Sequence, residues 1–248
     1  WQFDTDVASL APILNGQLLL AMRDGLWHFD PATGERARAA EVPYDPALER
    51  FNDGKCDAKG RFWVGTIYEP RDPPRAALYR FAHGGLEKQV DALTVTNGLA
   101  WSPNGRTIHW SDTQAHTIYA ADFDPAGGTL SRRRVFASFA PKVPGAPLAD
   151  YGGRPDGAAM DAEGCYWAAM FEGQRLVRLS PDGELVGEIA LPVRCPTMPC
   201  FGGADLKTLY ITSARENRPG TELIEQPYAG CVLAVEVEVP GLPANFAL

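Results

Sequence analysis

The sequence predicts an all-β chain that folds as a β-propeller, and three observations carry this prediction. The first is a repeat whose first-turn residues differ in number by 44, 45, 59 and 43, namely Gly16, Gly60, Gly105, Gly164 and Lys207. The second is the shortness of the apolar runs. The third is a content of 25 Gly and 21 Pro in 248 residues, which leaves little room for long helices. A repeat of this length with several short strands per unit is typical of propeller blades.

The apolar runs have the composition of strands. They contain many β-branched or aromatic residues and are bounded by Gly, Pro, Asp and Asn, which favours strands over helical repeats of a similar period. In chain order they are Gln17–Met22, Arg61–Ile67, Thr107–Ser111, Leu176–Leu179 and Leu209–Thr212. The longest interval contains Pro141–Gly153, a Pro- and Gly-rich stretch that predicts a loop insertion of about 14 residues. We count five blades in one domain over residues 1–248.

Composition limits the classes of partner. A hydrophobic content of 45% is ample for one core, and a net charge of −8 disfavours nucleic acid or an anionic membrane surface. No apolar stretch approaches the roughly 20 residues of a membrane span. The five cysteines form no CxxC pair and no zinc-ligand pattern, which predicts free thiols in a reducing compartment, by default the cytoplasm.

The residues that remain for chemistry are oxygen donors beside glycines. The chain has no Gly-x-Ser-x-Gly elbow and no His-Glu-x-x-His helix, and its four histidines lie at positions typical of strands and turns. Three times, however, an amide or a carboxylate precedes a glycine that opens an apolar strand. The sites are Asn52-Asp53-Gly54, Asn97-Gly98 and Asp156-Gly157.

These pairs have two interpretations. Asn-Gly and Asp-Gly are the strongest hairpin signals, because both residue types tolerate positive φ. Yet each unit already has a hairpin turn six to eight residues later, at Asp57–Gly60, Ser102–Gly105 and Asp161–Gly164. We therefore expect the three earlier pairs at the innermost strands, where the backbone crowds the propeller axis. Oxygen atoms from separate blades would then converge, as a hard cation requires.

At this point the chain resembles the SMP-30/gluconolactonase/LRE-like family. The resemblance covers almost the whole chain, and several motifs in order carry it. They are Arg50–Lys55 with Asp57 and Gly60-Arg61, Thr96–Leu99 with Ser102-Pro103, Arg154–Gly157 with Asp161 and Gly164, Cys195–Thr197 with Phe201–Gly203, Thr208–Tyr210, Thr212–Arg215 and Gly241–Pro243.

The resemblance implies a six-bladed β-propeller that holds one divalent metal at its centre. Of the family's ligands, the Asn before Gly matches Asn97 and the Asp before Gly matches Asp156. The family's third ligand, a Glu of the first blade, has no match, and we expect that blade upstream of Trp1, with Trp1–Val7 as its end. The first blade is thus expected to be largely absent from the chain.

The resemblance also implies residues that bind substrate. The family's Arg and Asn that grip the substrate match Arg50 and Asn52. Asp53 either helps to orient them or has a structural hydrogen-bonding role. Glu69 lies near a substrate-contacting loop of the family.

The implied activity is metal-dependent hydrolysis of a sugar (aldono-)lactone to the aldonic acid, a carboxylic ester hydrolase reaction. The metal (Ca, Zn, Mn or Fe) would polarise the lactone carbonyl, and Asp156 would act as the general base. The only expected partner is the small-molecule sugar lactone. Two alternatives remain: a metal-stabilised propeller that serves as a binding or regulatory scaffold, and a metal-dependent phosphotriesterase.

Overall fold

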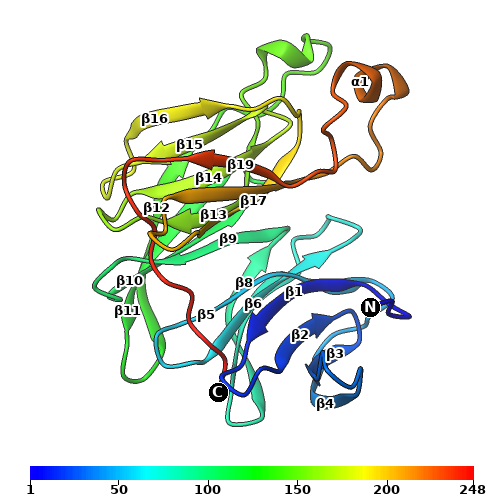
Figure 1. Ribbon diagram of the computed structural model, residues 1–248, viewed down its shortest axis with the longest axis vertical. Coiled ribbons are helices and arrows are strands. Elements are labelled where there is room, and N and C mark those ends of the chain that lie inside the picture. Colours follow the sequence, from blue (N-terminus) through cyan, green and yellow to red (C-terminus); the bar gives the residue numbers. More distant parts are fainter.

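Five antiparallel sheets follow one another along the chain in the computed structural model, which describes residues 1–248 (Figure 1). In each sheet, neighbouring strands are consecutive in sequence, so every connection is a simple hairpin. The first sheet contains β1 (Val7–Pro12), β2 (Leu18–Met22), β3 (Gly25–Phe29) and β4 (Arg36–Glu41). The second contains β5 (Glu49–Cys56), β6 (Phe62–Tyr68), β7 (Ala76–Ala82) and β8 (Gly85–Leu93).

The remaining three sheets repeat this plan with one exception. The third contains β9 (Thr96–Trp101), β10 (Thr107–Asp112), β11 (Thr117–Asp124) and β12 (Thr129–Ser138). The fourth contains β13 (Arg154–Met160), β14 (Tyr166–Phe171), β15 (Arg175–Leu179) and β16 (Leu185–Ala190). The fifth has three strands instead of four: β17 (Pro196–Gly202), β18 (Thr208–Ser213) and β19 (Leu233–Glu236).

The expectation of a six-bladed ring is wrong for this structure, which contains five sheets. Five repeat units are present in the sequence, and each builds one sheet. Residues 1–6 form no strand, and β1 is the innermost strand of the first sheet rather than the end of an upstream blade. The all-β propeller class itself is confirmed.

In the second and fourth blades an aspartate anchors the first hairpin. In the second blade, Asp57 Oδ1 accepts the Lys59 N–H at 2.8 Å, and Asp57 Oδ2 accepts the Trp63 Nε1–H at 3.0 Å. In the fourth blade, the Trp167 Nε1–H donates to Asp161 Oδ2 at 3.0 Å in the same way. One aspartate therefore caps the turn and satisfies the buried indole N–H of the next strand.

Core packing lies between the sheets. Each of the four larger apolar clusters combines side chains of two consecutive sheets, such as Leu19 with Phe62, Trp63 with Ile108, Ile118 with Tyr166, and Trp167 with Leu209. The innermost strands β1, β5, β9, β13 and β17 contact one another in this order. The five strands thereby line one axis, and all of them begin on the same face of the molecule.

Two loops on the face where the innermost strands begin are long. Residues 139–153 contain one 3₁₀ turn, η1 (Leu148–Asp150), which confirms the predicted loop insertion. The connection between β18 and β19 contains α1 (Gly220–Glu225). No helix is both long enough and apolar enough to cross a membrane, and all five cysteines are free.

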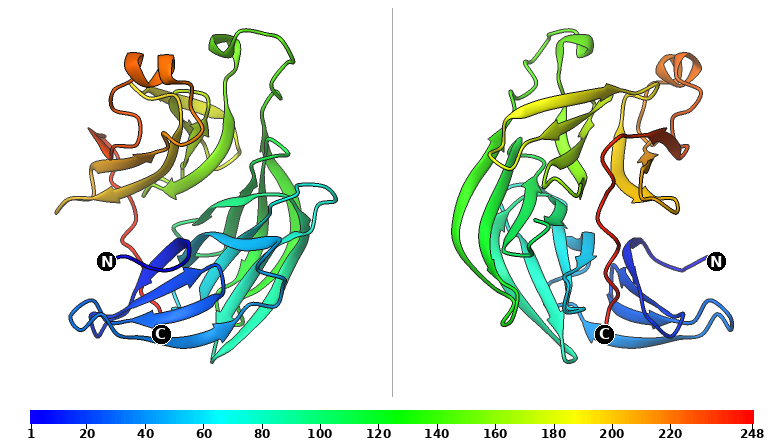
Figure 2. Two further views of the ribbon diagram at one scale, coloured as in Figure 1. Left: turned by 90° about the vertical axis from the view of Figure 1, so that its right-hand side faces the viewer. Right: turned by 60° about the vertical axis from the view of Figure 1, so that its left-hand side comes forward.

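A carboxyl-terminal segment, residues 240–248, crosses the opposite face of the sheets (Figures 1 and 2, red). Gly241 forms an isolated bridge with Asp161 of the fourth blade, and Ala247 forms another with Ile13 of the first. The Leu248 N–H also donates to Gly60 O of the second blade at 3.2 Å. The segment therefore ties blades that are far apart in the sequence.

Candidate active site at the propeller axis

The three glycine pairs lie within innermost strands and not in hairpin turns, as predicted. The pairing of β5, β9 and β13 with their neighbours is interrupted by a bulge at the same level, at residues 52–53, 98–99 and 156–157. A β-bulge turns side chains away from the regular alternation of a strand. The sequence therefore presents Asn52, Asn97 and Asp156 at one level of the axis.

Glycine is required at this level because the blades approach closely. Gly98 has φ +65°, and a Cβ atom there would lie 2.2 Å from Tyr166 Oη and 3.0 Å from Asp156 O. A Cβ atom on Gly157 would lie 2.6 Å from Thr197 O. Both distances are too short for a side chain, so these glycines let neighbouring blades meet at the oxygen cluster.

A chain of hydrogen bonds connects the second, third and fourth blades. Asn52 Nδ2 donates to Asn97 Oδ1 at 2.6 Å, and Asn97 Nδ2 donates to Thr113 Oγ1 at 2.8 Å. Thr113 Oγ1 in turn donates to Pro155 O, beside Asp156, at 2.7 Å. This chain fixes which amide atom of Asn97 is the oxygen, and that oxygen keeps a second lone pair.

Asp156 is half-buried and holds a proton more firmly than an exposed aspartate. Burial, and then the negative charge of Asp53, raise the pKa of Asp156 to about 8, against the effects of the Arg154 charge and the Gly157 N–H. A raised pKa favours a carboxylate that accepts a proton near neutral pH. A cation at the axis would oppose the shift and keep the group ionised.

Asp53 lies deeper than its neighbours. It is 7% exposed, and its Oδ2 accepts the Leu99 N–H at 2.9 Å. Burial raises its pKa, whereas the positive charge of Lys55 lowers it. Lys55 Nζ donates to Ala158 O at 2.9 Å and so reaches the fourth blade. These contacts fit the structural role considered for Asp53, and its contact with substrate stays a prediction.

Arg50 stands at the start of β5, above Asn52. Its Nε donates to Glu69 Oε1 at 3.2 Å, and the same carboxylate accepts from Arg23. Hydrogen bonding to Arg23, together with the Arg50 charge, lowers the pKa of Glu69. The side chain of Arg50 is 27% exposed, so it is held in place yet accessible from the face on which the innermost strands begin, which we call the entry face.

Sequence reasoning missed Thr113, which carries the link between Asn97 and Asp156. No motif surrounds this threonine, and its only local signal is its position directly after the strand that ends at Asp112. It also treated Arg154 only as part of a motif. In the structure Arg154 pairs with Glu172 at 3.2 Å at the start of β13.

The residues at the axis offer oxygen atoms to a divalent cation. No group of three or more His, Cys, Asp and Glu side chains is close enough to hold a metal ion. The available donors are the Asp156 carboxylate and the Asn97 amide oxygen, with the Asn52 amide beside them. Oxygen donors of this kind suit Ca²⁺ or Mn²⁺, whereas closed zinc sites use His and Cys.

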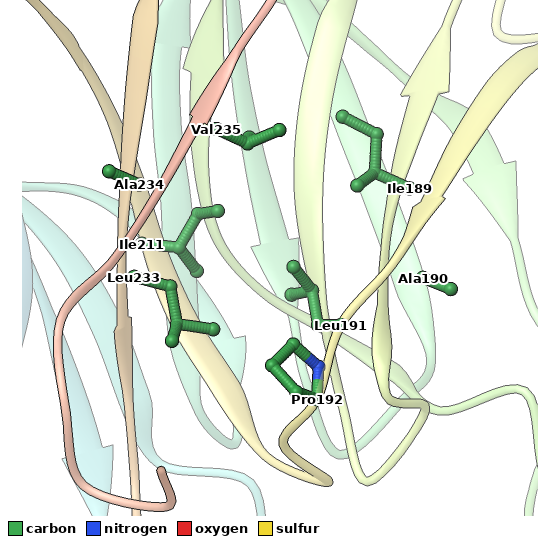
Figure 3. A pocket seen from close by; sticks show the side chains of 8 residues that line it. All are labelled: Ile189, Ala190, Leu191, Pro192, Ile211, Leu233, Ala234 and Val235. Atoms are coloured by element: carbon green, nitrogen blue, oxygen red, sulfur yellow. The ribbon is translucent and has the colours of Figure 1, made fainter.

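One apolar pocket between blades is not part of this site. Its volume is about 230 Å³, and it lies between the fourth and fifth blades, where Leu191, Ile211 and Leu233 face one another (Figure 3). Seven of its eight lining residues are hydrophobic, and none carries a charge. It offers no group for the chemistry of a lactone.

The fold and the axial oxygen cluster define a β-propeller whose candidate site is built from consecutive blades. The chain belongs to the SMP-30/Gluconolactonase/LRE-like family, which it matches over residues 1–215. It is 45% identical to the 6-deoxy-6-sulfogluconolactonase of Pseudomonas putida over 91% of this chain and 75% of that protein. It is 34% identical to regucalcin of Sus scrofa over 82% of this chain and 68% of that protein.

Solved structures agree with this assignment. A calcium-binding protein, regucalcin, from Agrobacterium tumefaciens superposes with a TM-score of 0.91 and 27% identity. The superposition covers 100% of this chain and 81% of that protein. The luciferin-regenerating enzyme matches with a TM-score of 0.86 at 24% identity and shows the fold alone.

Proposed function

We propose that this chain hydrolyses a sugar (aldono-)lactone to the aldonic acid with the aid of one divalent cation. The observation that carries the proposal is the hydrogen-bond chain from Asn52 through Asn97 and Thr113 to Pro155 O, which places an amide oxygen of the third blade beside the strand position of Asp156, a carboxylate of high pKa. Arg50 stands at the entrance to the same site.

The broader class rests on the family relationship. Relatives in this family are named as lactonases, and the chain is accordingly an enzyme, a hydrolase that acts on carboxylic ester bonds. A calcium-binding protein among the similar structures supports a divalent cation as the cofactor. The sulfonated lactone in the name of the Pseudomonas relative supports a sugar lactone as the substrate.

Each residue has a definite part in the reaction. Asn97 and Asp156 would hold the cation, which when bound supplies Lewis-acid polarisation of the lactone carbonyl. Asp156 accepts a proton from the attacking water as the water oxygen bonds to the carbonyl carbon. The bond from that carbon to the ring oxygen then breaks, and the ring oxygen leaves as a hydroxyl group with the proton from Asp156.

Arg50 and Asn52 orient the sugar. The Arg50 guanidinium donates to the ring hydroxyls or the lactone, and its fork is held by Glu69. The Asn52 amide is itself held by Thr96 O at 2.9 Å and by Asn97. A preorganised arginine and amide lower the entropy lost when a polyhydroxylated substrate becomes ordered.

Acid release measured above the spontaneous rate tests the proposal. Chelator-stripped protein would be assayed with glucono-, galactono-, xylono- and arabinono-lactones, without metal and with Ca²⁺, Mn²⁺, Zn²⁺ or Fe²⁺. We expect turnover that requires a cation and that disappears in Asp156→Ala. Asp182→Ala, which removes an exposed carboxylate from the β15–β16 turn, is the matched control and should retain turnover.

Other outcomes would favour the alternatives. A folded, cation-loaded protein that hydrolyses no lactone would refute the proposal and favour a binding scaffold. Turnover of an aryl phosphotriester without turnover of any lactone would favour a phosphotriesterase.

A further inference from the structure

Two arginines stand at the entry face directly above the axial oxygen atoms. Arg50 opens β5 two residues before Asn52, and Arg154 opens β13 two residues before Asp156. A third, Arg71, lies on the β6–β7 connection of the same face, where its N–H donates to Tyr68 O at 3.0 Å. The second and fourth blades thus direct guanidinium groups towards the mouth of one site.

Two carboxylates on this face are each shared by several cations. Glu69 is shared by Arg23 and Arg50, and Glu172 is shared by Lys142, Arg154 and Arg218. Five cations share four carboxylates in these ion pairs, once Asp6 and Glu222 are included. Arg71 is a sixth cation beside them, and none of these carboxylates forms an ion pair with it.

Arg71 is the cation without a partner. It takes part in no ion pair and in no side-chain hydrogen bond, unlike Arg50 and Arg154. Its backbone has φ +69°, a conformation that costs free energy in a residue other than glycine. Partial burial, followed by the positive charges of Arg50 and Arg154, lowers the pKa of Arg71, although a guanidinium remains protonated.

Glu172, the carboxylate that pairs with Arg154, already binds two other cations. Burial opposes ionisation of Glu172, but the hydrogen bond from Arg218 and the charges of Arg154 and Lys142 hold its pKa below the usual range. Glu172 is 8% exposed, so it cannot move out to reach Arg71. A guanidinium that lies beside two others and that forms no ion pair is available to an external anion.

We propose that Arg71 and Arg154 bind an anionic substituent of the substrate lactone, a sulfonate, phosphate or carboxylate at the end of the sugar remote from the reacting carbonyl. The inference rests on the proposed function, since it assigns the charge of the substrate at the same site. Arg50 still binds the hydroxyl groups of the sugar. Arg71 and Arg154 determine whether an anionic or a neutral lactone is the better substrate.

Matched lactones test the inference through a ratio of rates. The kcat/KM values of glucono-1,5-lactone, of its 6-phosphate and of its 6-deoxy-6-sulfo derivative would be compared, with a lactone bearing a 6-carboxylate as a fourth arm. Hydrogen bonds to charged groups predict that the anionic-to-neutral ratio falls about 10- to 100-fold in Arg71→Asn. Asparagine tolerates the positive φ of this position, so the variant should fold.

Control variants separate charge from structure. Arg71→Lys should recover part of the ratio, because it restores the charge without the fork. Arg106→Asn, which removes an arginine from the β9–β10 turn on the opposite face, should leave the ratio unchanged. The preference for the anionic lactone should also weaken as salt is raised.

A ratio near one in the wild type, or a ratio that Arg71→Asn leaves unchanged, would overturn the inference. If no lactone is hydrolysed, the proposed function fails, and calorimetric binding of sorbitol 6-phosphate against sorbitol decides the inference by itself. Tighter binding of the phosphate that is lost in Arg71→Asn would support it. Equal binding of the two probes would refute it.

Discussion

Replacing Gly98 by alanine tests whether close contact between blades builds the axial site. The new Cβ atom would lie 2.2 Å from Tyr166 Oη, 3.0 Å from Asp156 O and 3.1 Å from Ser111 Oγ. A left-handed backbone costs an L-residue about 1–2 kcal/mol, and overpacking costs about 1–3 kcal/mol more. We therefore expect Gly98→Ala to lower the free energy of unfolding by about 3 kcal/mol.

The backbone cost and the overpacking cost can be separated with two further variants, one at another glycine and one at the residue that the new Cβ atom would contact. Gly16 has φ +87° and no atom within 4 Å of a new Cβ, so Gly16→Ala should cost only the backbone term, about 1 kcal/mol. Tyr166→Phe removes the hydroxyl that donates to Gly98 O at 2.6 Å and should cost about 1 kcal/mol alone. In that background Gly98→Ala should cost about 1–2 kcal/mol less than in the wild type.

Urea unfolding of the four proteins of this cycle gives the coupling energy directly, provided that the m-value is constant. Lactone turnover of Gly98→Ala should fall further than that of Gly16→Ala, because the displaced atoms belong to Asp156 and its neighbours. An equal cost of Gly98→Ala in both backgrounds would refute the steric argument.

Three further predictions concern the site and its surroundings. Thr113→Val leaves an amide donor of Asn97 and the carbonyl of Pro155 unpaired, so cation affinity measured by calorimetry should fall about 10- to 100-fold; unchanged affinity would show that Asn97 needs no such support. In the cation-free protein the Asp156 pKa is about 8, so cation binding at pH 7 should release close to one proton. Calorimetry in buffers of different ionisation enthalpy measures this release, and Asp156→Asn should release no proton. Burial lowers the pKa of His109 to about 4. At this residue the unfolded chain therefore binds more protons than the folded chain between pH 6.5 and 4. From pH 8 to pH 5 the free energy of unfolding of the wild type should fall by about 2 kcal/mol relative to that of His109→Gln, a difference from which the opposite contribution of Asp156 cancels because both proteins contain it.

Local patterns in the sequence were sufficient for the blades and for most of the candidate site. The glycines and aspartates of the first turns predicted the hairpins, because their effects act within a few residues. Asn97 and Asp156 could be placed at one axis because a repeat puts equivalent positions at equivalent places. The innermost-strand position of both residues confirms that reasoning.

The features that the sequence did not predict depend on contacts between distant parts of the chain. The sixth blade expected from the resemblance is not among the five sheets that the structure contains, and the repeats of the sequence itself predicted only those five. Thr113 matters because Pro155 O of the next blade lies 2.7 Å away, and no spacing rule predicts that contact. That Arg71 forms no ion pair likewise becomes visible only in the structure, where Glu69 and Glu172 bind other cations.

The carboxyl-terminal segment has a consequence for the order of assembly during synthesis. Each blade is a local meander and can form soon after it leaves the ribosome. The contacts of the carboxyl-terminal segment with the earlier blades cannot form early, because Asn245 donates to Cys56 O across 189 residues of sequence. Closing so long a loop is slow compared with forming a hairpin. A nascent chain would thus carry Asn52, Asn97 and Asp156 before it acquires the segment that holds their blades in register.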